Sequence, residues 1–170
     1  MHRTGQNMDS TAVLRFDLQA LKKVIATVLQ LPDDLVILNN QPAFVGKVPF
    51  IMIRVLTSQT LGSDYRFNGK TEQEIITDSV ETTVSVNAYG RNANDLLGKL
   101  VALLKTSRAM SELKKAKMAV PRVSAVRNLT TAIGGGYEER AQMDLTVSHV
   151  YRITTDMMRA DTVDITVTKD

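Results

Sequence analysis

The chain has 170 residues, of which 44% are hydrophobic and 23% are charged, and this predicts one folded domain with a real core. It has no cysteine and only two histidines, His2 and His149, which excludes disulfide scaffolds, thiolate zinc sites, iron–sulfur clusters and cysteine nucleophiles. The longest apolar run, near 100–104, is too short to span a bilayer, and the net charge of +3 is too small to identify a partner.

The first residues are polar. Residues 1–8 are predicted to form a flexible arm in front of a single domain over 9–170. The start of the chain lacks the apolar stretch of a signal peptide. We therefore expect a soluble, intracellular chain with no membrane contact.

The first helix is expected from Asp9 or Ser10, either of which can cap it, to Leu31, where Pro32 stops it. Phe16 lies off the apolar stripe and hints at a second contact surface. The stripe itself steps by four and three residues along one face: Leu14, Leu18, Leu21, Ile25 and Val28.

Two strands are expected next, at 35–38 and 50–56, separated by a turn at 39–42. The following stretch, 57–69, is polar and rich in glycine and asparagine. Flanked by strand-like runs, it is interpreted as a long hairpin loop, extending to 70 at most.

The strongest strand signal covers 72–89, where apolar and polar residues alternate until Gly90. Asn92 is then the expected cap of a leucine-rich helix that continues, or kinks near 106–107, to about Lys117.

The last third of the chain is again strand-like. The pattern predicts an edge strand at 120–126 containing Pro121, a turn at 134–136, an alternating strand at 138–153 and a final strand at 163–167. The strands at 72–89 and 138–153 are too long for a compact domain unless their ends project. Such ends usually add to another chain's sheet, which favours assembly over catalysis.

Positive charge gathers in 99–127, which holds eight basic residues and one acidic residue. One interpretation is a solvated face whose cations offset a helix dipole. The other is a basic surface for DNA or for an acidic subunit. The segment has no helix-turn-helix, no zinc finger and no interleaved aromatic residues.

No motif amounts to an active site. The run 68–71 (Asn-Gly-Lys-Thr) resembles the end of a phosphate-binding loop, but Asp64 stands where glycine is needed and a strand follows, so we interpret it as a hairpin tip. Glu138 and Glu139 are adjacent on a strand and point to opposite faces. His149 is interpreted as a half-buried packing residue. No catalytic residue, metal or cofactor is expected.

Three segments resemble a known family when taken in order: 49–54 (Pro-Phe-Ile-Met-Ile-Arg), 84–93 (Val-Ser-Val-Asn-Ala-Tyr-Gly-Arg-Asn-Ala) and 137–145 (Tyr-Glu-Glu-Arg-Ala-Gln-Met-Asp-Leu). Their order and spacing are similar to those of the neck, or tail terminator, proteins of tailed bacteriophages, particularly phages with contractile tails. The resemblance covers roughly residues 10–168.

The resemblance implies an α+β fold, with two principal helices packed on one side of a mainly antiparallel sheet and with long projecting strands. It also implies a structural virion protein that forms a ring, expected to be hexameric, at the phage neck. Such a ring caps the tail tube, ends its polymerisation and joins it to the head connector, while double-stranded DNA passes through the lumen. The tail sheath would be a further partner, and assembly would take place in the host cytoplasm.

The resemblance also suggests interface residues. Tyr89, Arg91, Glu139 and Arg140 are candidates for structural or subunit contacts. Arg140 is the first candidate for an ion pair between subunits, and its alternative is an intrachain salt bridge with Glu138 or Asp144.

The basic segment supplies a second candidate surface. Four of its residues are candidates for a basic surface toward the lumen or a partner: Lys114, Lys115, Lys117 and Arg122. Two other functions compete with the ring. One is a sequence-independent nucleic-acid-binding module that uses 99–127, and the other is a small hydrolase with an unusual site. Salt-sensitive DNA binding by a stable monomer would favour the first of these.

Overall fold

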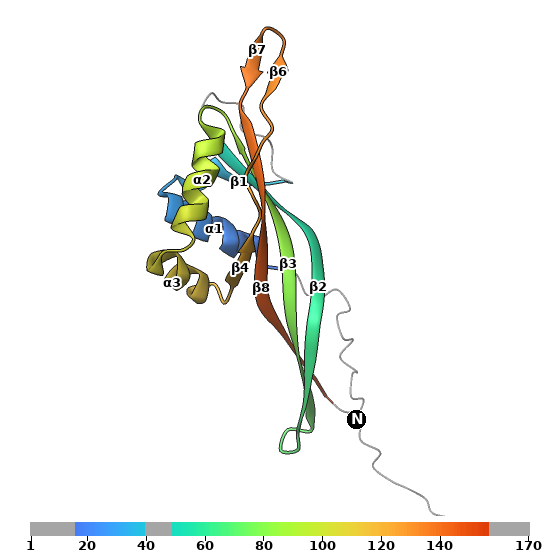
Figure 1. The fold of residues 1–170 in the computed structure, drawn as a ribbon. Helices are drawn as coiled ribbons and strands as arrows, with labels where there is room; N and C mark the ends of the chain where they lie inside the picture. The colour runs from blue at the N-terminus through green and yellow to red at the C-terminus, as the bar shows by residue number, and fades with distance from the viewer. Residues whose placement is uncertain (1–15, 40–48, 157–170) are drawn as a thin grey trace, which may run out of the picture.

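The computed structural model describes residues 16–39 and 49–156. It contains a mixed α+β fold built on a sheet with strand order β1-β2-β3-β8-β4, and β5 also pairs with β8 (Figure 1). Three predictions lie outside the described residues: the flexible N-terminal segment at 1–8, the helix start near residue 10 and the strand at 163–167. The strands are β1 Val36–Leu38, β2 Phe50–Asn68, β3 Gln73–Tyr89, β4 Ala119–Val123, β5 Arg127–Asn128 and β8 Arg140–Asp156.

Three long strands, β2, β3 and β8, form the centre of the sheet. β3 pairs antiparallel with both β2 and β8, whereas β1 pairs parallel with β2. The prediction of long strands near 72–89 and 138–153 is confirmed. β4 lies at the edge of the sheet and contains Pro121, as the sequence predicts, because an edge position does not need every backbone donor.

The prediction of a loop at 57–69 is wrong. This stretch continues β2, and its residues pair with β3 down to Asn68 opposite Gln73, so only the turn after Asn68 closes the hairpin. The stretch lacks apolar alternation because both of its faces are exposed. Its strand conformation comes from hydrogen bonds to β3 rather than from burial. The interpretation of 68–71 as a hairpin tip is confirmed.

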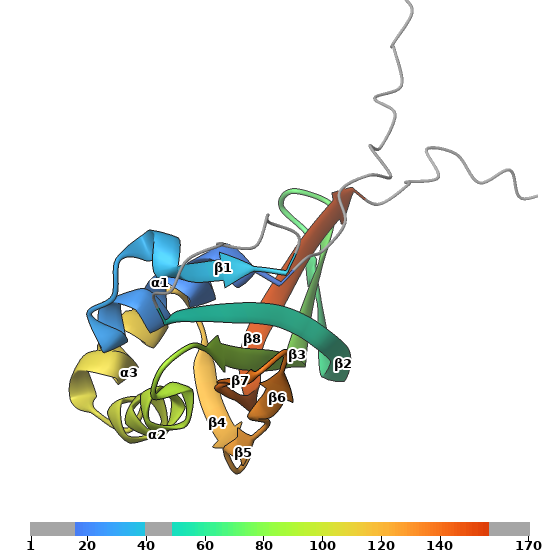
Figure 2. The ribbon, with the colours of Figure 1, turned by 90° about the horizontal axis from the view of Figure 1, so that it is seen from above.

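The helices pack on one face of the sheet (Figure 2). They are α1 Leu18–Leu29, α2 Ala93–Leu103 and α3 Ser107–Lys115, and a short 3-10 turn, Asp33–Leu35, follows α1. The Asp17 side chain caps α1. The expected kink is a complete break, because Thr106 caps α3 as a separate helix. The fully buried side chains come from these helices and from the strands beneath them: Leu21, Ile25, Ile51, Ile53, Val84, Leu97, Leu100 and Leu145 among others.

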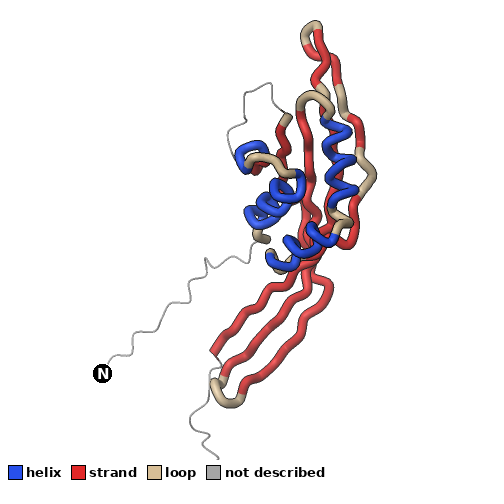
Figure 3. The backbone as a smooth tube through the Cα atoms, turned by 90° about the vertical axis from the view of Figure 1, so that its left-hand side faces the viewer, coloured by secondary structure: helices blue, strands red, loops and turns tan. Residues whose placement is uncertain are grey.

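The molecule therefore has two regions that share the same strands. We call the helix-covered part the body. We call the remainder the arm: residues 57–68 of β2, 73–79 of β3 and 150–156 of β8, which project beyond the helices as three strands (Figure 3). At the opposite end of the molecule, β6 (Thr131–Ile133) and β7 (Gly136–Glu138) form a small hairpin (Figure 1). Gly134 and Gly135 turn between them, as predicted.

Candidate assembly surfaces

Tyr89 and Arg140, two of the predicted interface residues, lie together on the sheet face opposite the helices. The sheet register places Phe50, Tyr89 and Arg140 in one row across three strands. The rings of Phe50 and Tyr89 stack with centroids 4.9 Å apart, and the Arg140 guanidinium lies 5.0 Å from the Tyr89 ring centroid. This cation–π contact holds the guanidinium against the sheet.

Arg140 also donates a hydrogen bond from Nη2 to Asn87 Oδ1 at 3.1 Å. Among the described residues it forms no ion pair with Glu138 or Asp144, so the intrachain salt bridge considered above is not formed. Its Nε is buried without a hydrogen-bond partner among the described residues. The arginine thus keeps its charge unpaired on a surface that the helices leave uncovered.

A network of polar side chains continues from this row along the same face. The amide Nε2 of Gln142 donates to Ser85 Oγ at 3.1 Å and to Asp144 Oδ1 at 2.6 Å. Asn87 donates to the same serine, and Arg127 forms an ion pair with Asp144 at 2.9 Å. The network gives hydrogen bonds to polar side chains that are buried on this face, so the face is ordered but polar.

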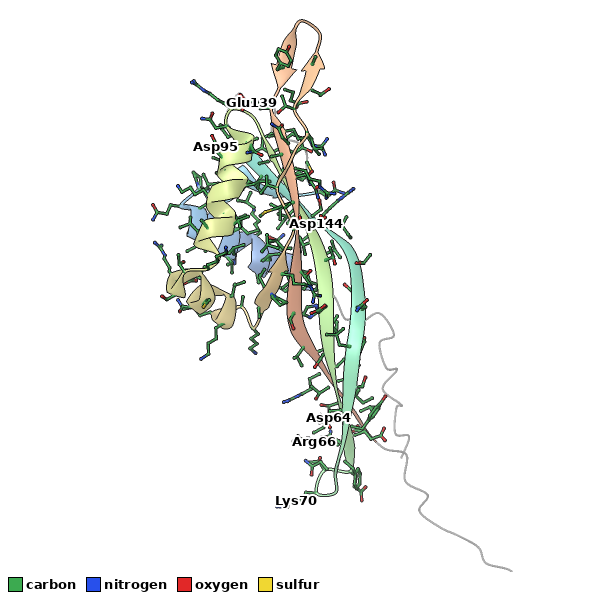
Figure 4. All side chains as sticks on the ribbon, in the orientation of Figure 1. Asp64, Arg66, Lys70, Asp95, Glu139 and Asp144 are labelled. Carbon is green, nitrogen blue, oxygen red and sulfur yellow. The ribbon has the colours of Figure 1, made fainter. Side chains whose placement is uncertain are left out.

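Glu139 and Arg91 lie at the corner between β3 and α2 rather than in that row. The Glu139 carboxylate accepts a hydrogen bond from the Asn92 backbone N–H at 2.6 Å, and the Glu139 carbonyl accepts one from Gly90 N–H. Figure 4 labels Glu139 beside the start of α2. Arg91 is exposed and borders a small hollow of about 320 Å³ that Leu31 and Pro49 also line. Glu139 therefore anchors the start of α2, where a carboxylate also suits the helix dipole.

The four predicted basic residues fall into two groups. Lys114, Lys115 and Lys117 are exposed at the end of α3, where Lys115 forms an ion pair with Glu112 at 2.7 Å. Arg122 lies on β4 and forms an ion pair with Glu81 of β3. Glu81 alternates with the buried Val80 and Thr82, so it points away from the helices. The basic segment therefore does not present one continuous free charge.

His149 packs where the body meets the arm. It is 7% exposed, more deeply buried than the sequence analysis expected. Its Nε2 is 2.8 Å from Thr82 Oγ1, and its ring contacts those of Phe16 and Tyr151. Burial lowers the pKa of His149 below its usual 6.5, which favours the neutral imidazole. The off-stripe position of Phe16 is explained by this ring contact.

The described residues offer little for catalysis. They contain no cluster of three or more histidine or acidic side chains that could hold a metal ion. A groove of about 900 Å³ lies beside His149, lined by Phe16, Leu38, Leu56 and Tyr151 among others. Apolar and polar side chains line it in similar numbers, and it does not gather the titratable groups that a hydrolase needs. None of the described helices is long and apolar enough to cross a membrane.

The arm carries exposed apolar side chains that the sequence analysis did not identify as functional. Tyr65 is 70% exposed and Phe67 61% exposed. The register aligns Tyr65 with Ile76 and Ile153 in one row across the three strands. Tyr65 and Phe67 are two residues apart in the sequence, and residues with this spacing share one face of a strand. The spacing could be recognised as a shared face only once this stretch was known to be a strand.

Comparison with known proteins gives one family. A family model described as phage neck terminator protein matches residues 19–170. No curated protein matches the chain. The matched range spans the helices, the sheet and the arm, so it covers both regions described above.

Proposed function

Because this chain belongs to the phage neck terminator protein family, a family of structural proteins of the phage neck, we propose that it forms a ring that caps the tail tube. In this proposal the ring has six subunits, ends polymerisation of the tube and joins it to the head connector. Double-stranded DNA passes through its lumen. Where the tail is contractile, the last layer of sheath also contacts the ring, and the ring assembles in the host cytoplasm.

The observation that carries the proposal is the uncovered arm. Three strands extend beyond the body with apolar side chains on an exposed surface, and monomeric proteins rarely leave such groups exposed without a partner. The β6–β7 hairpin extends from the opposite end and carries Tyr137, which is 83% exposed. Two dissimilar ends suit a ring that meets the tail tube on one side and the connector on the other.

The charge arrangement favours weak DNA contact. Three of the eight basic residues in 99–127, Lys115, Arg122 and Arg127, form ion pairs, which leaves five exposed cations of the segment without an ion pair among the described residues. DNA affinity depends steeply on the number of phosphates that a surface neutralises. A lumen in which ion pairs reduce the number of free cations contacts DNA weakly, which lets the DNA slide through.

The size of the assembly tests the proposal. We expect mass photometry and negative-stain images to show rings of six subunits, either free or formed on purified tail tubes, and we expect no retardation of DNA at physiological salt. A stable monomer that binds DNA in a salt-sensitive way and leaves tail tubes uncapped would instead support the nucleic-acid-binding alternative.

A second experiment tests the lysines of α3. Replacing Lys114, Lys115 and Lys117 together by serine is expected to change tail joining or DNA ejection, and because all three are exposed the variant should still fold. The control replaces Lys23, an exposed lysine outside the basic segment, by serine. Unchanged assembly, joining and ejection in the triple variant would show that these lysines face neither the lumen nor a partner.

A further inference from the structure

The arm has two open edges. Among the described residues, β1 pairs with β2 only at 51–53, and β4 pairs with β8 only at 145–148. Beyond those positions, toward the tip of the arm, the outer side of β2 and the outer side of β8 have no neighbouring strand in the described part of the chain. Their backbone N–H and C=O groups on these sides form a template for a further strand.

The outermost segments of these edges carry charged side chains but lack three other devices that usually protect an edge, namely proline, lysine and a bulge. The β2 segment 63–68 and the β8 segment 150–156 contain no proline and no lysine. Both pair with β3 without interruption, since the two register shifts of β2 lie nearer the body, between Val55 and Thr57 and between Thr60 and Gly62. An open, regular edge without proline, lysine or a bulge is a candidate pairing site.

The two edges also lie at the same level of the arm. The register places Asp64 of β2, Thr77 of β3 and Arg152 of β8 in one row on the face opposite the helices. The next row, on the other face, holds Tyr65, Ile76 and Ile153. One edge thus ends in a carboxylate and an aromatic ring, and the other ends in a guanidinium and an aliphatic chain. Within the chain, the Asp64 carboxylate also accepts a hydrogen bond from Arg66 Nε at 3.0 Å, and both side chains are exposed.

Strand direction decides how two copies can combine. Both β2 and β8 are antiparallel to β3, so they run in the same direction. Rotation about an axis along the arm preserves that direction and brings the β8 edge of one copy beside the β2 edge of the next. The contact is heterologous, as a closed ring requires. By contrast, pairing two β2 edges or two β8 edges through a twofold axis stops at a dimer.

We propose that the β2 edge of each arm pairs in parallel with the β8 edge of a neighbouring copy, with Asp64 of one copy beside Arg152 of the next. This inference rests on the proposed ring. Tyr65 then lies beside Ile153 across the same contact, so an opposite-charge pair and an aromatic–aliphatic pair form on the two faces. Repeated around the ring, this pairing leaves neither edge of any arm open.

Engineered cysteines test the pairing, since the chain contains no cysteine of its own. Within one chain, Asp64 and Arg152 are separated by β3, about 9.5 Å at two strand spacings. A disulfide needs α-carbons less than about 7 Å apart. The double variant Asp64→Cys/Arg152→Cys should therefore form disulfides only between copies. After oxidation of assembled rings, a denaturing gel without reductant is expected to show a ladder of covalent multimers up to the ring number.

Two controls define the register and the symmetry. Asp64→Cys/Asp156→Cys places the second cysteine on the same face of β8 but four residues away, and it should give little ladder. Either Asp64→Cys or Arg152→Cys alone should give no covalent product. Efficient covalent dimers of a single variant would show twofold pairing of identical edges and would overturn the proposal.

The outcomes separate this inference from the proposed function. Rings that form normally while the double-cysteine variant gives no ladder would overturn arm pairing and leave the terminator ring intact. Unmodified protein that forms no ring, even on tail tubes, would overturn the proposed function itself. Circular dichroism of each variant before oxidation confirms that it is folded.

Charge reversal gives an independent measurement. Asp64→Arg and Arg152→Asp should each raise the concentration needed for ring assembly, by about two- to fivefold per contact. The combined variant Asp64→Arg/Arg152→Asp should recover part of that loss, because the opposite charges again meet between copies, while the ion pair of Asp64 with Arg66 stays lost. Additive losses in the combined variant would show that the two residues do not meet and would count against the proposed register.

Discussion

Strands β2, β3 and β8 run through two regions that have the same backbone pairing but different surroundings. In the body, Val84 and Leu145 face each other under the helices and are fully buried. In the arm, Ile76 and Ile153 face each other on the same side of the same strands, but none of the described helices covers them. The hydrogen-bond ladder continues unchanged from one pair to the other, so a strand does not need a core beneath it along its whole length.

The difference separates two roles for apolar side chains. In the body they contribute to folding, because their burial against α1, α2 and α3 removes apolar surface from water. In the arm they remain available to a second chain. We therefore expect body variants to change the stability of the subunit and arm variants to change assembly.

The largest expected effect is a difference in the free energy of unfolding between two alanine variants on one strand. Leu145→Ala should lower the free energy of unfolding by about 2–5 kcal/mol, because it opens a cavity in a fully buried part of β8. Ile153→Ala, on the same face of β8 in the arm, should cost about 1 kcal/mol or less. Urea denaturation of both variants checks this, and equal losses would show that the arm is as tightly packed as the body.

A smaller effect is expected where the backbone turns. Gly90 has φ of +91°, and a Cβ there would lie 3.1 Å from the Pro49 Cα. Gly90→Ala should therefore cost about 1–3 kcal/mol of unfolding free energy. The matched change at the arm tip, Gly69→Ala, meets only an ordinary contact of 3.6 Å with the Phe67 ring and should be near neutral.

Thermal and urea unfolding of both glycine variants measure this difference. If Gly69→Ala were the more damaging of the two, the arm turn would be under tighter constraint than the corner of the body, which would reverse the comparison.

The smallest effect concerns the boundary between the regions. Because burial lowers the pKa of His149, the unfolded chain takes up the proton more readily than the folded one. The stabilisation from the neutral ring is present above the usual pKa of 6.5, and it is lost progressively as the pH falls below that value toward the lower folded pKa. His149→Gln should flatten this part of the stability profile.

Urea unfolding between about pH 7.5 and 5.5 measures the slope for both proteins. His2 is retained in each, so it contributes equally to both profiles. An unchanged slope in His149→Gln would show that His149 does not carry this pH dependence.

Several parts of the fold followed from residue patterns alone. Alternation over 72–89 identified both the strand and its buried face, because period-two polarity reports which side meets a core. Pro121 indicated an edge, and Thr106–Ser107 marked the place where the second helix could break. The three segments that resembled terminator proteins also led to the family that the whole-chain comparison identifies.

Contacts between residues far apart in the sequence could not be predicted in this way. Tyr89 pairs with Phe50 and Arg140, which lie about 40 and 50 residues away along the chain. Arg122 likewise forms its ion pair with Glu81 of β3. No local pattern records such partners. For this reason the sequence could not show that Arg122 pairs with Glu81 while Lys114 and Lys117 of the same segment do not.

By itself, then, the sequence determined that the chain has no cysteine chemistry, that 72–89 and 138–153 are long strands and which face of each is buried, because composition and periodicity are local properties. Only the tertiary structure decided that 57–68 is a strand and that Asp64 and Arg152 end one row at two open edges. A polar stretch with both faces in water carries no signal of burial, and its conformation is set by hydrogen bonds to a strand that comes later in the chain.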